Sequence, residues 1–241
     1  MQYKFSEKFN YEDFSSGRFL YHMPGGTNFP VRLAYEIFKR CLSHIENKDN
    51  VCIYDPCCGE GYLLTVLGFL NMHLIKYIVG SDINQKAVET AVKNINLLSI
   101  EGILARINEL KTLHEKYGKN SHLEALETGK RLLSLVLKES VPIDCSMFYT
   151  NILDKNALSG RNFKADIVIT DIPYGNMTKW EDDNEHAVDI LLNNIRPVLK
   201  KDSVVAICSD KKQKFNGQGY FRLEKQQIGK RKFEIFKNVF E

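Results

Sequence analysis

The sequence has 241 residues, of which 44% are apolar and 26% are charged, as in an ordinary soluble globular protein. This length suits one large domain or one domain with insertions, and no apolar run is long enough to span a membrane as a helix. The first residues lack the apolar core of a signal peptide. Because the six cysteines lack the paired spacing of a zinc site, we expect a reduced, cytoplasmic protein without a metal centre.

The net charge of +3 is unevenly distributed along the chain. From Lys200 to the C-terminus there are eleven Lys and Arg residues against five Asp and Glu residues, a net +6, so the rest of the chain carries −3. A basic segment of this kind is commonly a solvated surface, but it is also the electrostatic footprint of a polyanion partner. We favour the polyanion because of the motifs described below.

The first 29 residues contain short aromatic groups separated by Ser and Gly, and they lead to Pro24-Gly25-Gly26. We expect an extended N-terminal lead-in over residues 1–29 that packs on the main domain. A helix is predicted next, with Asn28 as its cap and Pro30 in its first turn. Its apolar residues recur at helical spacing and are Leu33, Ile37, Phe38 and Leu42.

An apolar run over residues 51–54 ends in Asp55-Pro56, and a loop containing Gly59 and Gly61 then leads into an apolar helical pattern. This order predicts a buried strand, a tight turn and the start of a helix. Glycine at positions 59 and 61 permits positive φ angles and a close approach of the backbone to a ligand. The loop is either a plain strand–turn–helix junction or the cofactor loop of a class I methyltransferase.

Two later features favour the methyltransferase. An apolar run from residue 75 ends at Asp82, where nucleotide-binding folds place a carboxylate that accepts hydrogen bonds from a ribose diol. Asn84 is better placed than Asp82 to cap the helix that follows. A further strand is predicted over residues 165–170 from its apolar run Ile167-Val168-Ile169, and it leads into the turn Asp171-Ile172-Pro173-Tyr174, which supplies polar and aromatic groups at the same edge of a parallel sheet.

The turn that begins at Asp171 is predicted to be catalytic. Methyl transfer from a sulfonium is an in-line displacement, so the enzyme must hold a nitrogen lone pair in line with the methyl group. Asp171 can accept a hydrogen bond from the target N–H and take its proton, Pro173 stiffens the turn, and Tyr174 offers a ring on which a base can stack. Trp180, the only tryptophan, lies on the adjoining segment.

Residues from about 102 to 141 carry no strand pattern. Their leucine and isoleucine spacing predicts two helices that break at residues 117–121, where Gly118 ends one helix and Ser121 can cap the next. A parallel crossover needs only one helix, so this segment is an inserted helical hairpin. It pads the sheet, forms a dimer contact or builds a wall of the substrate site.

The remaining pattern predicts strands at residues 142–148 and 203–209 and a helix at 185–199. Asn151, after the first of these strands, is a candidate for bonding the amino edge of an adenine ring. Residues 220–223 and 233–239 are predicted to pair as antiparallel strands. The basic residues between them, Lys230, Arg231 and Lys232, would form a hairpin tip suited to phosphate contacts.

With these motifs named, the sequence resembles the AviRa-type avilamycin-resistance methyltransferases, which modify a guanine in large-subunit ribosomal RNA. The resemblance covers nearly the whole chain and is most distinctive at Asp55-Pro56-Cys57-Cys58-Gly59. It implies S-adenosylmethionine as the cofactor. It also implies an α/β, Rossmann-like class I methyltransferase fold, with a mostly parallel seven-stranded sheet, helices on both faces and the inserted helical hairpin.

We therefore expect one methyltransferase domain over residues 1–241, a monomer whose target is a base nitrogen, most simply in a guanine of 23S rRNA, free or in the large ribosomal subunit. The candidate cofactor-binding residues are Asp55, Cys57, Gly59, Gly61, Asp82, Ile83, Asn151 and Asp171. The candidate catalytic residues are Asp171, Pro173 and Tyr174, and the candidate substrate-binding residues are Tyr174, Trp180, Lys230, Arg231 and Lys232.

Several alternatives stay open from the residues alone. Ile172 stands where amino-group methyltransferases with an Asn/Asp-x-Pro-Tyr turn usually have a proline, so the acceptor is N1 or N2 of guanine or an adenine amino group. DNA, tRNA or a protein amide are alternative substrates. Asp82 would also suit the ribose of a nicotinamide cofactor in an oxidoreductase, although the glycines do not follow Gly-x-Gly-x-x-Gly. A non-catalytic RNA-binding module is the last alternative.

Overall fold

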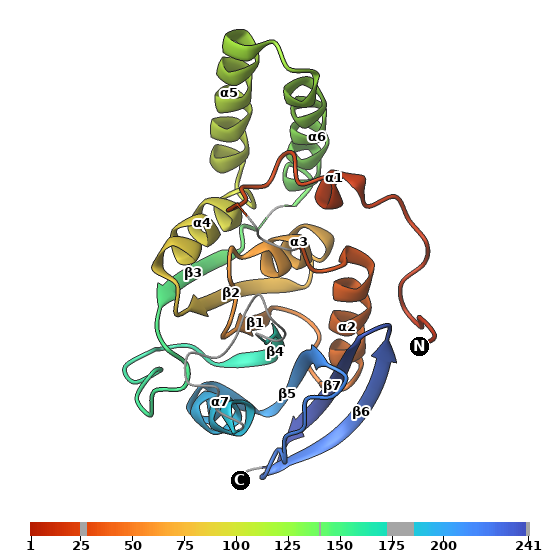
Figure 1. Ribbon diagram of the computed structural model, residues 1–241, viewed down its shortest axis with the longest axis vertical. Coiled ribbons are helices and arrows are strands. Elements are labelled where there is room, and N and C mark those ends of the chain that lie inside the picture. Colours follow the sequence, from red (N-terminus) through yellow and green to blue (C-terminus); the bar gives the residue numbers. More distant parts are fainter. Residues whose placement is uncertain (25–27, 140, 173–185, 240–241) are drawn as a thin grey trace.

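The computed structural model describes residues 1–24, 28–139, 141–172 and 186–239. Within these ranges one seven-stranded sheet has the order β3-β2-β1-β4-β5-β7-β6 (Figure 1). The first five strands in this order are parallel, β7 is antiparallel to β5, and β6 is antiparallel to β7, which confirms the mostly parallel sheet. The strands are β1 (Val51–Asp55), β2 (Ile75–Asp82), β3 (Asp144–Tyr149), β4 (Ala165–Asp171), β5 (Leu199–Asp210), β6 (Tyr220–Ile228) and β7 (Arg231–Asn238).

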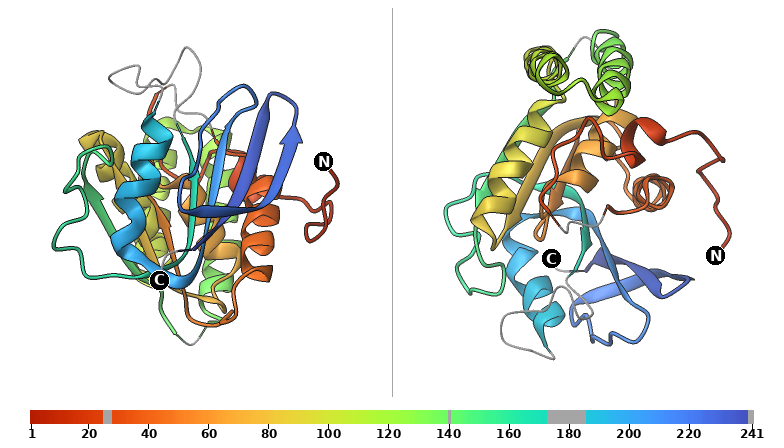
Figure 2. Two further views of the ribbon diagram at one scale, coloured as in Figure 1. Left: turned by 90° about the horizontal axis from the view of Figure 1, so that it is seen from below. Right: turned by 45° about the horizontal axis from the view of Figure 1, so that its top comes forward.

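Helices cover both faces of the sheet, as predicted. One face is covered by α2 (Val31–Ser43), α3 (Tyr62–Leu70) and α4 (Gln85–Asn96), and the other by α7 (Ala187–Ile195) (Figures 1 and 2). A short 3₁₀ helix, Arg196–Val198, follows α7, so this helix is shorter than the sequence predicts. Among the described residues, no helix is both long and apolar enough to cross a membrane.

The central strands are buried on both sides because helices cover both faces. In β1 all five residues are buried, and Ile53 contributes to the core beneath α2 and α3 while Tyr54 contributes to the core beneath α7. The same alternation separates Ile167 from Val168 in β4. The residues before Asp55 in β1 are therefore all apolar, and β4 has the apolar run Ile167–Ile169 shortly before Asp171.

The strand order changes direction between β1 and β4. From β1 the chain proceeds outward to β2 and β3, and it then returns to place β4 on the other side of β1. In open α/β sheets, ligands bind at the carboxyl edge of the strands where the strand order changes direction, and this edge lies at the ends of β1 and β4. The predicted cofactor loop, after β1, and Asp171, the first residue of the predicted catalytic turn, both lie at this edge.

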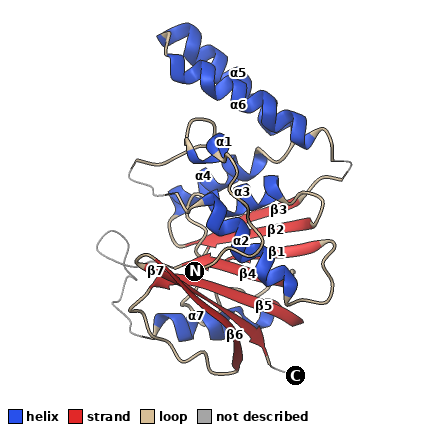
Figure 3. Cartoon of the chain, turned by 90° about the vertical axis from the view of Figure 1, so that its right-hand side faces the viewer, coloured by secondary structure: helices blue, strands red, loops and turns tan. Residues whose placement is uncertain are grey.

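The inserted hairpin consists of α5 (Ile100–Tyr117) and α6 (Asn120–Val136) and projects from the sheet (Figures 1 and 3). The predicted end of the first helix is confirmed, because α5 stops at Gly118, which has a φ of 61°. The predicted capping role of Ser121 is wrong. Helix α6 already begins at Asn120, and its N-cap, Lys119, makes no side-chain capping bond.

The described part of the N-terminal segment runs across both α2 and the hairpin and contains the short helix α1 (Glu12–Ser15) (Figure 1). The carboxylate of Glu36 accepts backbone N–H bonds from Lys4, Phe5 and Ser6 at 2.7, 2.8 and 2.9 Å. Burial would raise the pKa of Glu36, but these bonds and one from Arg40 outweigh it and lower that pKa. Asn28 does not cap α2, since its N-cap is Pro30, which offers no side-chain bond.

Candidate cofactor and substrate site

The glycine loop after β1 combines two positive φ angles, 52° at Gly59 and 72° at Gly61. A Cβ at Gly61 would lie 3.0 Å from the Cβ of Ala91, so α4 leaves no room for a side chain there. A Cβ at Gly59 would meet nothing within 4 Å. Gly61 is therefore required by packing, whereas Gly59 borders open space that a ligand can fill.

Asp82 ends β2 and holds the glycine loop in place. Its Oδ2 accepts a hydrogen bond from the backbone N–H of Gly59 at 2.8 Å, and its Oδ1 accepts one from Asn84 at 2.9 Å. Burial raises the pKa of Asp82, and these backbone bonds offset part of that rise. Asn84 caps α4 as predicted, accepting N–H bonds from the first turn. Asp82 is thus free of the capping role and retains lone pairs for a ligand.

Asp55 ends β1 and is buried beneath the loop. Its Oδ1 accepts the N–H of Cys57 at 3.0 Å. The pKa of Asp55 is raised to about 7, chiefly by burial and further by the neighbouring Asp82 and Asp171, while hydrogen bonds from Thr170 and the Cys57 N–H act in the opposite direction. Three carboxylates at the ends of β1, β2 and β4 therefore influence one another, and such a cluster favours a cationic ligand.

Three other candidate cofactor residues, Cys57, Ile83 and Asn151, follow the carboxyl ends of β1, β2 and β3. Ile83, directly after Asp82, is a large apolar side chain that is 36% exposed. Asn151 follows β3, and its Oδ1 accepts the N–H of Leu153 at 3.0 Å, so the turn uses one of its lone pairs. Burial raises the pKa of the Cys57 thiol, which keeps the sulfur protonated and weakly reactive.

Asp171 ends β4, where it pairs in register with Cys208 of β5. The next residue, Ile172, is buried in the core on the α7 side, and its N–H donates to the carbonyl of Cys208 at 3.1 Å. The isoleucine that replaces the usual proline therefore anchors this corner. The predicted residues Pro173, Tyr174 and Trp180 lie outside the described residues.

The structure separates the three basic residues predicted for the hairpin tip. Lys230 is exposed in the turn between β6 and β7. Arg231 turns toward the carboxylates, with its Nη1 3.9 Å from Oδ2 of Asp171. The predicted exposure of Lys232 is wrong: its side chain is 4% exposed, pairs with Glu234 at 2.5 Å and donates to a backbone carbonyl at 2.6 Å. Lys232 is therefore part of the sheet interior and not of a phosphate-binding tip.

Sequence reasoning did not include the loop between β5 and β6 among the site residues. The backbone N–H of Lys211 donates to the carbonyl of Lys230 at 3.0 Å, so this loop lies beside the hairpin turn. The exposed lysines on the two turns are Lys211, Lys212, Lys214 and Lys230. The run of lysines after β5 is the sequence signal that would have identified them.

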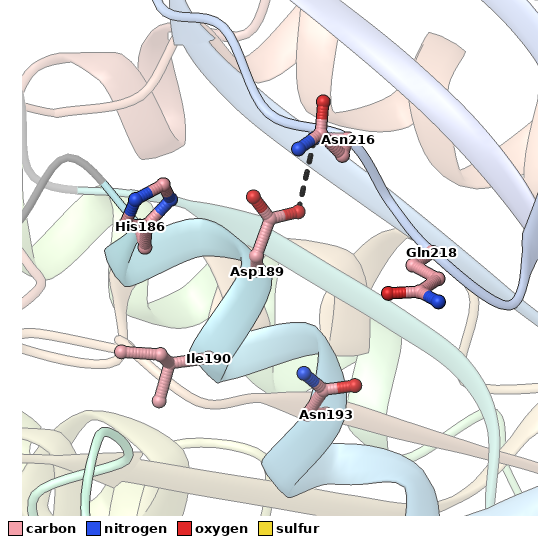
Figure 4. Close-up of a pocket in the computed structure, with 6 residues that line it drawn as sticks. All are labelled: His186, Asp189, Ile190, Asn193, Asn216 and Gln218. Atoms are coloured by element: carbon pink, nitrogen blue, oxygen red, sulfur yellow. Dashed lines mark hydrogen bonds between the residues drawn. The ribbon is translucent and has the colours of Figure 1, made fainter.

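A separate polar depression lies between α7 and the same loop (Figure 4). The Oδ1 of Asp189 accepts the backbone N–H groups of Asn216 and Gly217 at 3.0 and 2.9 Å. The lining residues are His186, Asp189, Ile190, Asn193, Asn216 and Gln218, and none of them is a sequence-predicted site residue. The carboxylate of Asp189 holds the loop that carries the lysines.

The glycine loop after β1 and the carboxylates that end β1, β2 and β4 lie at one edge of a mostly parallel sheet, which defines a class I methyltransferase. The chain belongs to the rRNA methyltransferase AviRa family, whose family model matches residues 1–231. This membership decides against the nicotinamide-dependent oxidoreductase and the non-catalytic module.

Named relatives of the chain support its membership of this family. The chain is 36% identical, over 93% of its length and 91% of the relative's, to the 23S rRNA (guanine(2535)-N(1))-methyltransferase of Streptomyces viridochromogenes. A solved structure of the rRNA methyltransferase AviRa from that organism has a TM-score of 0.85 and 33% identity, covering 97% of this chain and 94% of that one. The putative methyltransferase YhhF of Escherichia coli, with a TM-score of 0.53, 12% identity and coverage of 91% and 92%, shares the fold alone.

Proposed function

We propose that this protein transfers a methyl group from S-adenosylmethionine to N1 of a guanine in 23S ribosomal RNA. The relative that is 36% identical carries that activity in its name. The observation that supports the chemistry is the convergence of Asp55, Asp82 and Asp171 beside the glycine loop. In this proposal the whole chain acts as one methyltransferase domain in the cytoplasm, on free rRNA or on the large ribosomal subunit.

The residues at this edge fit the cofactor. The absence of a side chain at Gly59 leaves open space in front of the loop, and a side chain at this position would enter that space. Asp82, fixed by two backbone N–H bonds, has lone pairs for the two hydroxyls of a ribose. The exposed Ile83 beside it offers an apolar surface for one face of an adenine ring. The cluster of carboxylates suits the positive charges of a sulfonium and an amino group.

Bound in this place, S-adenosylmethionine supplies an electrophilic methyl group. Asp171 accepts a hydrogen bond from the N–H of the target base and holds the nitrogen in line with that methyl. S-adenosylmethionine would supply the methyl group for the new N–C bond and leave as S-adenosylhomocysteine, while the Asp171 carboxylate would take the N–H proton of the target base. Asp55 stays beneath the loop and orders it through Cys57.

The exposed lysines of the two neighbouring turns are the proposed contacts to RNA. Lys211, Lys212 and Lys214 lie on the β5–β6 loop, and Lys230 lies on the β6–β7 turn that is bonded to it. Both turns stand at the carboxyl edge of the sheet, beyond Asp171. Phosphate contacts from such lysines position the nucleic acid without reading its sequence.

Incubation with tritiated S-adenosylmethionine tests the proposal. Separate reactions contain 23S rRNA, tRNA, duplex DNA and ribosomal protein, each with the wild-type protein and with Asp171→Ala. We expect label in 23S rRNA alone, removed by Asp171→Ala, and mass mapping to locate it on N1 of a guanine. Label only in tRNA, DNA or protein would refute the rRNA assignment, and label on N2 would refute the assignment of the atom.

A further inference from the structure

Arg231 joins three distant parts of the chain. Its Nη1 lies 3.9 Å from Oδ2 of Asp171, and both side chains are 27% exposed. Its guanidinium carbon lies 5.3 Å from the centre of the Phe29 ring, a buried residue just before α2. A guanidinium over an aromatic face is held by the ring's quadrupole as well as by packing. The side chain is therefore held at the carboxyl edge of the sheet and not extended into solvent.

Strand register explains how Arg231 reaches Asp171. Cys208 of β5 pairs with Asp171 on one side and with Phe233 of β7 on the other. Residues two apart in a strand share a face, so Arg231 projects on the same face as Phe233, whose side chain lies in the core beneath α2. Cys208, which lies between Asp171 of β4 and Phe233 of β7, is buried in the same core as Phe233.

The charges around Asp171 give this contact a chemical consequence. The charge of Asp171 raises the pKa values of Asp55 on β1, Cys57 in the glycine loop and Cys208 on β5. The charge of Arg231 on β7 lowers the pKa of Cys208 and so opposes Asp171 there. Neighbouring carboxylates oppose one another's ionisation. A guanidinium, which stays charged at any pH that a protein tolerates, offsets that repulsion.

We propose that Arg231 is a positioning residue for methyl transfer: it keeps the Asp171 carboxylate ionised and oriented so that it can accept the N–H of the target base. The inference rests on the proposed function, since it assigns Asp171 the role of proton acceptor. The sequence predicts a phosphate contact for Arg231. In this proposal Arg231 has the positioning role instead, and its exposed neighbour Lys230 contacts phosphate.

Three variants separate these roles. Arg231→Gln removes the charge with little change in size, Arg231→Lys keeps the charge, and Lys225→Gln removes a charge from an exposed position of β6 as a matched control. Each is assayed for methyl transfer to 23S rRNA from tritiated S-adenosylmethionine across a range of pH, at varied RNA concentration. Thermal melting and S-adenosylhomocysteine binding establish that each variant is folded.

For Arg231→Gln we expect kcat to fall by about 10–100-fold, with KM for RNA changed by less than about twofold. We expect the acidic limb of its rate profile to move upward by about one pH unit, because the carboxylate has lost its counter-charge. Arg231→Lys should restore most of kcat and the original acidic limb. Lys225→Gln should match the wild type in all three quantities.

Other results would overturn the inference. A rise in KM for RNA with kcat and the pH profile unchanged would make Arg231 a phosphate contact. An equal loss of kcat in Arg231→Lys and Arg231→Gln would show that the shape of the arginine side chain matters and its charge does not. Label absent from rRNA with the wild-type protein would overturn the proposed function itself. Label from the wild type and from Arg231→Gln at equal rates and at every pH would overturn only the role of Arg231.

Discussion

Asn94 of α4 is bonded to Tyr21 at both of that residue's backbone polar groups. Its Nδ2 donates to the Tyr21 carbonyl at 2.9 Å, and its Oδ1 accepts the Tyr21 N–H at 2.8 Å. The same Nδ2 donates to the carbonyl of Glu60, between the two loop glycines, at 2.9 Å. One buried amide thus ties the N-terminal segment to the glycine loop.

Asn94→Ala should therefore affect both stability and ligand binding. Removing three partly buried hydrogen bonds and leaving their backbone partners unsatisfied should cost about 2–4 kcal/mol of unfolding free energy. The loosened loop should weaken S-adenosylhomocysteine binding by about tenfold. Urea unfolding and calorimetry measure these effects. Asn96→Ala, at an exposed position of the same helix, should change neither; equal losses in both variants would show a general helix effect.

The two loop glycines should respond differently to alanine. Both substitutions place a side chain at positive φ, which costs about 1 kcal/mol. In Gly61→Ala the new methyl also collides with Ala91, so we expect a further loss of stability of about 1–3 kcal/mol.

In Gly59→Ala the methyl enters open space, so the loss of stability should be limited to the backbone strain. If that space is the cofactor site, S-adenosylhomocysteine should bind at least about tenfold more weakly. Thermal melting and calorimetry on the two variants separate packing from ligand contact. Unchanged affinity in Gly59→Ala would place the ligand elsewhere.

The site was predictable from sequence where local pattern alone fixed the geometry. The run into Asp55, the glycine loop and the run into Asp82 each define a strand end, and parallel strands bring such ends to one edge. The cap Asn84 was predictable for the same reason, because its geometry involves only the next three residues.

The placement of the basic hairpin depended on long-range pairing and was not predictable in the same way. The sequence pattern starts the last strand at Phe233, but pairing with β5 extends it back to Arg231. Alternation then places Lys232 in the interior beside Glu234 and directs Arg231 to the opposite face. No local signal reveals that β7 lies next to β5, which is what brings Arg231 to Asp171.

Asp55 should make stability depend on pH in an unusual direction for a carboxylate. Its pKa is raised from 3.8 to about 7, chiefly by burial, so between these values the folded state binds more protons than the unfolded state. Its contribution is fully present below the unfolded pKa and is lost as pH rises through about 7.

Asp55→Asn removes this titration and keeps an oxygen that can accept the Cys57 N–H. Relative to the wild type, the variant should therefore gain stability as pH rises from about 4 to 8, by on the order of 2–4 kcal/mol. Urea unfolding of both proteins at several pH values gives the difference directly, and the subtraction removes the titration of other groups. A difference that is constant with pH would show that Asp55 is ionised throughout.

Asp189 should control how RNA binds without touching the cofactor site. Its Oδ1 holds the backbone N–H groups of Asn216 and Gly217 in the loop that carries the exposed lysines (Figure 4). Asp189→Ala should release this loop and raise the Kd for 23S rRNA by about threefold to tenfold in filter binding, leaving the calorimetric affinity for S-adenosylhomocysteine unchanged. Asp189→Asn retains an acceptor oxygen and should stay within about twofold of the wild type. An equal loss of cofactor affinity in Asp189→Ala would instead indicate that the substitution disturbs α7 and the sheet beneath it.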